Sequence, residues 1–437
     1  RREMLSSPHM ICGLGLAVRR VNLHELASDQ VKLTRWWPTM LLIPAFSTPT
    51  FKAAGFTSLF GVDLFVTAVA LAVAAAVLTM LKGTPVRLIG LVPLVVMVVF
   101  MIPGLVRPGL TEYAAQKPWL FLLGSVPLAI AVFIVCSDRE QWQALLRIPV
   151  LVAILAVVLT MVTGAAEEGA VAADRLSLGG NTLGLAYTLG AGIVAAVLLF
   201  ATGQWRFWIS LPLLIVFVPT LLSIGSRGPV LGTVVTLAIA LVMGVSMGLG
   251  ERTVGRLLVM GGSLTVVVLA VLPFTSEVAL DRIVGIVTGT STVEDTARQQ
   301  LWDTAVQLFE SQPFVGVGVG GFADYYVGID FIRYPHNLFF EMAAEFGLLG
   351  LLGLGVLLGM SYLALFRSRL TSGSLQTATM LTYWLVGLSM FSGDLLERQW
   401  LIWTAAGLAC LGVGCVDPDP KHGSPARLPE SRLLERQ

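Results

Sequence analysis

One histidine in the body of the chain is placed to act as a general base. The sequence contains four histidines, and His9, His24 and His422 lie near its ends, whereas His336 directly precedes a long apolar segment. Pro335 restricts the backbone before it, and the partial positive charge at a helix N-terminus favours a neutral imidazole. A neutral imidazole accepts a proton from a substrate hydroxyl. The alternative is an interfacial histidine that is hydrogen-bonded for structure.

Arginines provide the matching chemistry for an anionic substrate. Arg227 lies within residues 225–229 (GSRGP), between two long apolar segments, and no acidic residue occurs within twenty positions of it. An arginine at membrane depth is costly and often functional, and the glycines and proline predict a tight non-helical turn with free N–H donors. Arg175, Arg298 and Arg333 are further candidates. One arginine guanidinium can bind two phosphate oxygens at once, so several arginines favour a diphosphate as the substrate anion. The alternative for Arg227 is an anchor at a helix end.

Other motifs near His336 carry weaker signals. The glycine run at residues 316–321 has no P-loop lysine after it, so we expect a close turn that returns the chain toward the membrane. Glu341 and Glu345 follow His336 one helical turn apart, and either could orient the imidazole or pair with an arginine. The acidic residues before His336 lack the spacing of a metal site, so we predict neither metal nor cofactor.

The composition defines the environment of these residues. Hydrophobic residues make up 56% of the 437 and charged residues 13%, and the mean hydropathy is +0.83. Soluble domains carry about 25% charged residues, so most of this surface must face lipid. The net charge of +1 gives no field that would attract nucleic acid.

The apolar runs predict an all-α polytopic membrane protein with about twelve transmembrane helices. The first run, with Pro44 and Pro49, is short enough to be re-entrant or interfacial. The predicted spans are residues 36–50, 58–81, 86–106, 118–136, 145–164, 183–202, 205–223, 229–248, 255–273, 338–366, 376–394 and 399–415.

The spans divide the chain into regions. The predicted order is a cytoplasmic segment (1–35), nine helices (36–273), a large outer loop with a helix at 296–310 (274–337), three helices (338–415) and a disordered cytoplasmic tail (416–437). The loops assigned to the inside hold nine Lys and Arg against six in the short outer loops, among which we count Lys117. The positive-inside rule therefore places both termini in the cytoplasm and His336 outside.

Several motifs in this order resemble the O-antigen ligase and polymerase superfamily of bacterial envelope glycosyltransferases. They are PHNLFFE at 335–341 and EFGLLG at 345–350, supported upstream by SRG at 226–228, RQQLW at 298–302 and PFVGVG at 313–318. The combination covers most of the chain from about residue 175 to 350.

The resemblance implies a GT-C-like membrane glycosyltransferase in the bacterial inner membrane. It would transfer a glycan from an undecaprenyl-diphosphate-linked donor to an acceptor hydroxyl at the periplasmic face, with inversion and without metal or cofactor. The resemblance implies His336 as the catalytic base, the diphosphate-binding residues Arg227, Arg175 and Arg298, and the supporting residues Asn337, Glu341 and Arg333.

Three alternatives stay open at this stage. A ligase would use a lipid A–core acceptor, which the compact outer loop favours. A polymerase would use a second lipid-linked glycan, and a protein-glycosylating relative would use a protein. A transporter would need charges buried within spans and two corresponding halves, and Asp63 is the main charge of that kind. A non-catalytic scaffold would leave the His336 segment unexplained.

Overall fold

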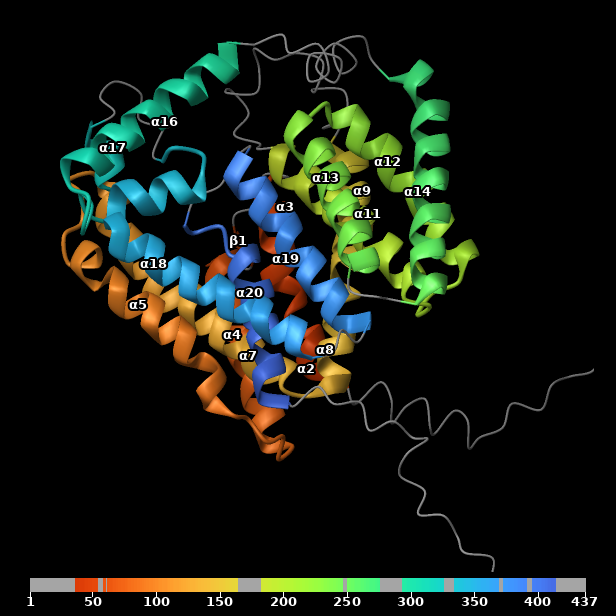
Figure 1. Ribbon diagram of the computed structural model, residues 1–437, viewed down its shortest axis with the longest axis horizontal. Helices are drawn as coiled ribbons and strands as arrows, with labels where there is room; N and C mark the ends of the chain where they lie inside the picture. Colours follow the sequence, from red (N-terminus) through yellow and green to blue (C-terminus); the bar gives the residue numbers. More distant parts are fainter. Residues whose placement is uncertain are drawn as a thin grey trace, which may run out of the picture.

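The computed structural model describes residues 36–53, 58–59, 61–163, 182–246, 250–275, 293–325, 334–368, 372–390 and 395–413. Within these ranges the chain is almost entirely helical, as predicted (Figure 1), and its strands are β1 (Ser58–Leu59) and β2 (Val62–Asp63), which form a two-stranded antiparallel hairpin. The predicted cytoplasmic segment (1–35) and the predicted disordered tail (416–437) lie outside the described residues.

Two sets of helices, from the first and the second half of the chain, pack against each other in one bundle. The first set comprises α2 (Trp37–Met40), α3 (Ile43–Ala53), α4 (Leu64–Leu81), η1 (Leu88–Leu91), α5 (Val92–Leu105), α6 (Glu112–Leu120), η2 (Phe121–Ser125), α7 (Val126–Cys136), α8 (Arg139–Leu145) and α9 (Ile148–Thr163). The second set comprises α11 (Thr182–Ala201), α12 (Phe207–Ile224), α13 (Arg227–Ser246), α14 (Glu251–Val271), η4 (Leu272–Phe274), α16 (Val293–Ser311), α17 (Gly321–Tyr325), α18 (Leu338–Arg367), α19 (Ser372–Met390) and α20 (Gln399–Val413).

Nine stretches of the described residues are long and apolar enough to cross a membrane. They correspond to nine of the predicted spans. The other three predicted spans are helical but do not meet the same measure: α3 and α20 are shorter, and α19 is less apolar. The chain is a multi-pass membrane protein, and the total of twelve stays a prediction.

Some helix boundaries differ from the sequence prediction for local reasons. The span predicted at 58–81 begins only at Leu64, because the hairpin occupies its start and the Asp63 carboxylate caps α4 by accepting a hydrogen bond from Phe65 N (2.6 Å). The span predicted at 118–136 begins at Glu112, since α6 continues through the π-helical turn η2 into α7.

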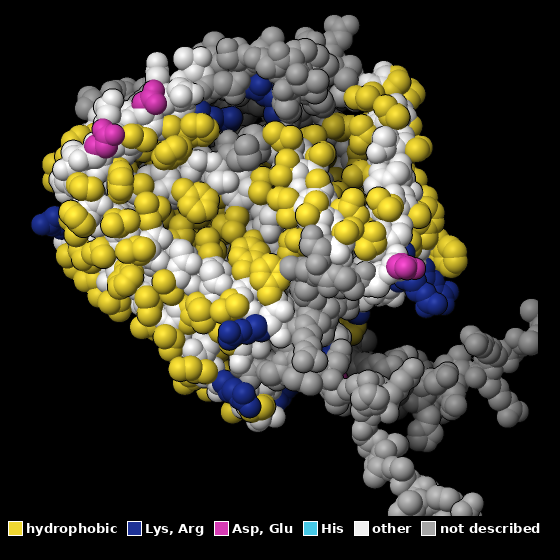
Figure 2. All heavy atoms as spheres, viewed as in Figure 1, with side chains coloured by type: hydrophobic (Ala, Val, Ile, Leu, Met, Phe, Trp, Pro, Cys, Tyr) yellow, Lys and Arg dark blue, Asp and Glu magenta, His cyan; other side chains and the backbone are white. Residues whose placement is uncertain are grey.

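The surface has the distribution expected of a membrane protein. Figure 2 shows hydrophobic side chains over the broad middle of the molecule and charged side chains mainly toward its two ends. Helix α14 lies at the periphery (Figure 1), with exposed side chains such as Val266 and Leu269. Helix α11, in contrast, is almost entirely buried among the other helices. Side chains that face lipid in this way need no polar cover.

Contacts between helix ends define two ends of the bundle. At one, the Arg398 guanidinium at the start of α20 lies 3.2 Å from the centroid of the Phe65 ring at the start of α4. At the other, the Arg147 guanidinium lies 5.0 Å from the centroid of a Trp36 ring just before α2. We call the first the His336 end, because α18 also begins there. The side of the membrane that each end faces stays a prediction.

Candidate active site

His336 has an unusual backbone conformation. Its φ is 54°, and all other described residues with a positive φ are glycines. For a side chain larger than glycine this left-handed conformation costs about 1–3 kcal/mol and persists only where neighbouring structure imposes it. Such strain gathers at functional positions, so the backbone singles out the same histidine as the sequence did.

Helix α16 holds the residues before His336. The indole Nε1 of Trp302 donates to the carbonyl oxygen of Pro335 (3.1 Å), and the Trp302 ring packs on Phe340 with centroids 5.5 Å apart. The Tyr334 ring lies against the imidazole, with centroids 4.4 Å apart. α16 was predicted at 296–310 and spans Val293–Ser311, so the helix in the large loop is confirmed.

Asn337 fixes the residue after His336. Its Oδ1 caps α18 by accepting hydrogen bonds from the N–H groups of Phe339 (2.9 Å) and Phe340 (3.2 Å). Its Nδ2 donates to the carbonyl oxygen of Ser389 near the end of α19. Asparagine is among the preferred N-cap residues because its short side chain reaches these otherwise unpaired donors. His336 is thereby held between α16 on one side and α18 with α19 on the other.

A break divides α18 shortly after its start. Gly347 has φ 62° and ψ −154°, which no helical residue adopts. The N–H groups of Leu348 and Leu349 bond instead to the carbonyl oxygens of Pro313 (2.7 Å) and Phe314 (3.2 Å). The backbone of the PFVGVG motif therefore fills the gap in α18.

The glycine run closes the same junction. Val317 N donates to Ala344 O (2.9 Å) and Gly318 N to Glu345 O (3.0 Å). A Cβ on Gly316 would overlap the Glu345 backbone, and one on Gly318 would overlap the Arg107 carbonyl. The expected close turn is present, and glycine is needed there because backbones touch.

Glu341 and Glu345 have a partner that the sequence did not indicate. The Lys117 ammonium lies 2.8 Å from one Glu345 oxygen and 3.0 Å from the other, and it also pairs with Glu341. All three side chains are 0% exposed. Assigning Lys117 to an outer loop was therefore wrong: it belongs to α6 and lies inside the bundle, because its head finds two carboxylates there.

Arg298 lies on α16, half-buried and close to the His336 segment. The Tyr187 phenol on α11 is within electrostatic range of Arg298, Glu397 and Tyr334. Tyr334 packs on the imidazole, so Arg298 and the His336 segment both lie within electrostatic range of Tyr187. Tyr187 and Glu397 were not foreseen, since nothing in the sequence relates them to position 336.

Arg227 begins α13, directly after Gly225 ends α12 in the left-handed conformation. The tight turn is thus present, but it is shorter than predicted: Gly228 and Pro229 belong to the first turn of α13, where proline is tolerated because the first N–H groups have no helical partner. The Arg227 side chain is half-buried.

Helix register relates Arg227 to the His336 end. α19 runs antiparallel to α11, because Gln376 near its start bonds Thr202 at the end of α11, whereas Gly387 accepts a hydrogen bond from Tyr187 near the start. Two tight turns, after α11 and α12, make α13 parallel to α11 and so antiparallel to α19.

The contact between α13 and α19 shows how far along the bundle axis Arg227 lies. The Tyr383 phenol and the Thr233 hydroxyl both lie beside Gly190. Arg227 precedes Thr233 by six residues and Ser389 follows Tyr383 by six, so each lies about 9 Å from that contact in the same direction. Arg227 is therefore level with Ser389, whose carbonyl binds Asn337. Figure 2 shows Lys and Arg atoms inside a hollow at this end of the molecule.

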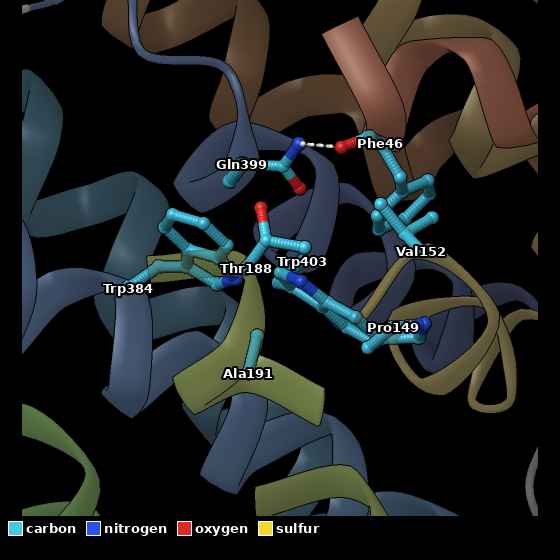
Figure 3. Close-up of a pocket in the computed structure, with 8 residues that line it drawn as sticks. All are labelled: Phe46, Pro149, Val152, Thr188, Ala191, Trp384, Gln399 and Trp403. Atoms are coloured by element: carbon cyan, nitrogen blue, oxygen red, sulfur yellow. Dashed lines mark hydrogen bonds between the residues drawn. The ribbon is translucent and has the colours of Figure 1, made fainter. Parts of the chain in front are cut away.

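Two predicted residues, Arg175 and Arg333, lie outside the described residues. The part of the chain that the structure describes contains no group of three His, Cys, Asp or Glu side chains suited to a metal ion. Within it, a small pocket lies deeper between α3, α9, α11, α19 and α20 (Figure 3), where Gln399 Nε2 donates to Phe46 O (3.4 Å). Trp384 and Trp403 border that pocket, and none of the predicted site residues does.

The fold defines a multi-pass membrane protein in which His336 lies where α16, α18 and α19 meet. Residues 212–355 match the family model described as O-antigen ligase. The match begins within α12, ends within α18 and includes Arg227, Arg298 and His336. No curated protein matches the chain. The match supports the O-antigen ligase and polymerase superfamily, and with it a membrane glycosyltransferase of that general type.

Proposed function

We propose that this protein transfers a glycan from a polyprenyl-diphosphate-linked donor, undecaprenyl diphosphate in bacteria, to an acceptor hydroxyl at the outer face of the inner membrane. The acceptor we favour is the lipid A–core, which makes the enzyme ligase-like. A second lipid-linked glycan as acceptor would make it a polymerase.

The observation that carries the proposal is the strained backbone of His336 within the region that matches the O-antigen ligase family. A fold does not hold a histidine at φ 54° without support from its neighbours. Here α16 binds Pro335 on one side of it, and α18 and α19 bind Asn337 on the other. Arg227 on α13 and Arg298 on α16 would suit an anionic donor at this end of the bundle.

In the proposed reaction, His336 takes the proton of the acceptor hydroxyl while that oxygen attacks the anomeric carbon of the donor sugar. The new bond joins the acceptor oxygen to that carbon, and the bond from the carbon to the diphosphate oxygen breaks. The polyprenyl diphosphate leaves with the bonding electrons. A single displacement of this kind inverts the anomeric centre.

Positive side chains would assist the departure of the diphosphate. Arg227 and Arg298, together with Arg175, would bind the phosphate oxygens and stabilise the charge that grows during bond breaking. Because these groups are already charged and held by helices, they need little rearrangement during the reaction. The donor is activated by its diphosphate, so the proposed reaction needs neither metal nor nucleotide.

Reconstitution of the purified full chain in lipid vesicles tests this proposal. Lipid-linked donor is supplied with either lipid A–core or a second lipid-linked glycan, in the presence of a chelator, and products are identified by mass spectrometry. We expect product with lipid A–core from the wild type and none from His336→Ala. Gln307→Ala, at an exposed position on α16, is the matched control and should retain activity.

Each outcome has a defined meaning. Full activity of His336→Ala would refute the assigned base. Product only with the second lipid-linked glycan would replace the ligase assignment by the polymerase one. Loss of activity in the presence of the chelator would refute metal independence. Absence of product with either acceptor would refute the proposed glycosyltransferase activity.

A further inference from the structure

The buried cluster of Lys117, Glu341 and Glu345 is more elaborate than a simple ion pair. Lys117 comes from α6, whereas the two glutamates lie one turn apart on the first part of α18. The second Glu341 oxygen accepts a hydrogen bond from Leu395 N (2.8 Å), just before α20. Three elements are therefore joined through three fully buried side chains, an arrangement that persists only when the charges are paired.

The reason for such a junction lies in the break at Gly347. Residues 338–346 form a short helix of their own, since Leu348 and Leu349 bond to the 313–314 backbone rather than to α18. The long membrane helix after the break therefore does not fix the direction of the short one. His336 lies just before this short helix, so the position of its imidazole depends on what else holds residues 338–346.

Helix α6 is a firm support for that purpose. Asp324 in α17 accepts hydrogen bonds from Leu110 N (2.7 Å) and Thr111 N (3.1 Å) at the start of α6, and Thr111 caps the helix through Ala114 N (3.2 Å). Through its other end α6 continues into the membrane-spanning α7. Lys117 thus connects the short helix to an element that is itself held at both ends.

We propose that Lys117 is a positioning residue for His336: by binding Glu341 and Glu345 it fixes the short helix 338–346, and with it the direction of the imidazole. The proposal rests on the proposed function for its kinetic part only. Lys117 does not touch substrate in this scheme, so its loss should impair turnover rather than donor binding.

Two variants separate positioning from stability. Lys117→Met removes the ammonium but leaves two buried carboxylates without it. The triple variant Lys117→Met, Glu341→Gln, Glu345→Gln replaces the whole cluster by uncharged groups of similar size, which is tolerated far better than a broken pair. Lys82→Met is the matched control, since it removes an ammonium at an exposed position at the far end of α4.

Two measurements are made on the folded, reconstituted proteins. Transfer kinetics should show kcat lower by about 10- to 100-fold in both variants, as small misplacements of a catalytic group produce, with the donor KM within about twofold of wild type. The rate at which diethyl pyrocarbonate modifies His336, followed by peptide mass spectrometry, should rise in both variants. Lys82→Met should match the wild type in both.

The outcomes decide the proposal without reference to which glycan is used. A triple variant that folds and shows wild-type kcat and His336 modification would overturn it, as would failure of both variants to fold, since the cluster would then serve the whole bundle. If the wild type shows no transfer at all, the proposed function fails, and the modification rate still tests the positioning.

Discussion

The indole nitrogen of Trp302 donates a hydrogen bond to the carbonyl oxygen of Pro335, at 3.1 Å. This bond joins the helix of the large loop to the residue that precedes the strained His336. It connects the RQQLW motif (298–302) with the PHNLFFE motif (335–341), more than thirty positions apart in the sequence. The bond explains why the first motif contains a tryptophan.

Trp302→Phe tests this connection. The ring can still pack on Phe340, but the hydrogen bond is lost, which removes about 0.5–1.5 kcal/mol. If that bond orients Pro335 for catalysis, single-turnover transfer should slow by about 2- to 10-fold. Trp208→Phe, at an exposed position on α12, is the control and should leave the rate unchanged. An unchanged rate in Trp302→Phe would show that ring packing alone suffices.

His336→Gly and His336→Ala should differ in stability in an unusual order. Glycine adopts φ near 54° without strain, whereas alanine does not, so the glycine variant should be more stable by about 1 kcal/mol. Both should be inactive. Thermal unfolding in detergent measures the difference. At Gln307, in the helical part of α16, the order should be reversed, with alanine the more stable. The same order at both positions would contradict a strained His336.

Gly347→Ala should destabilise the protein severely. A Cβ there would lie 2.5 Å from the Phe314 carbonyl carbon, and the φ of 62° disfavours any side chain. We expect a loss of more than about 2 kcal/mol in the free energy of unfolding. Gly355→Ala, farther along α18, has open space around its Cβ and should be neutral or slightly stabilising. Equal effects at the two glycines would argue against the break as a structural requirement.

Arg227→Lys should weaken donor binding although the charge is kept. A lysine cannot bind two phosphate oxygens in the planar geometry of a guanidinium. We expect the donor KM to rise about 10-fold for Arg227→Lys and about 100-fold for Arg227→Ala. Titration of a fluorescent lipid diphosphate gives the affinities directly. Wild-type affinity in Arg227→Ala would refute the proposed role, and Arg206→Ala, before α12, serves as a control.

The helices were predictable from the sequence because each is a long run of apolar residues, and a run of this kind has few alternatives in a membrane. Their ends were less predictable, since α4 begins later than the predicted span, where Asp63 caps it, and the π-helical turn joins α6 to α7. The helix around Trp302 was found from its pattern alone. Arg175 and Arg333 stay predictions.

The site was only partly predictable, because burial and contact between distant segments leave no local mark. His336 stands out as the one histidine in the body of the chain, and Arg227 by its isolation among apolar residues. Lys117 does not: next to Pro118 at the start of an apolar run it is typical of a loop, and only the approach of Glu341 and Glu345 makes its burial possible. The break at Gly347 is likewise defined by a segment more than thirty residues earlier.

The backbone contact between residues 313–318 and the break in α18 has an evolutionary consequence. The two segments meet through main-chain atoms at Gly316 and Gly347, so this contact does not depend on the neighbouring side chains. The Phe314 side chain, for example, is largely exposed. Among related proteins, position 314 should therefore vary while both glycines are retained. The spacing of the two glycines, rather than the residues between them, should identify distant relatives with the same backbone contact.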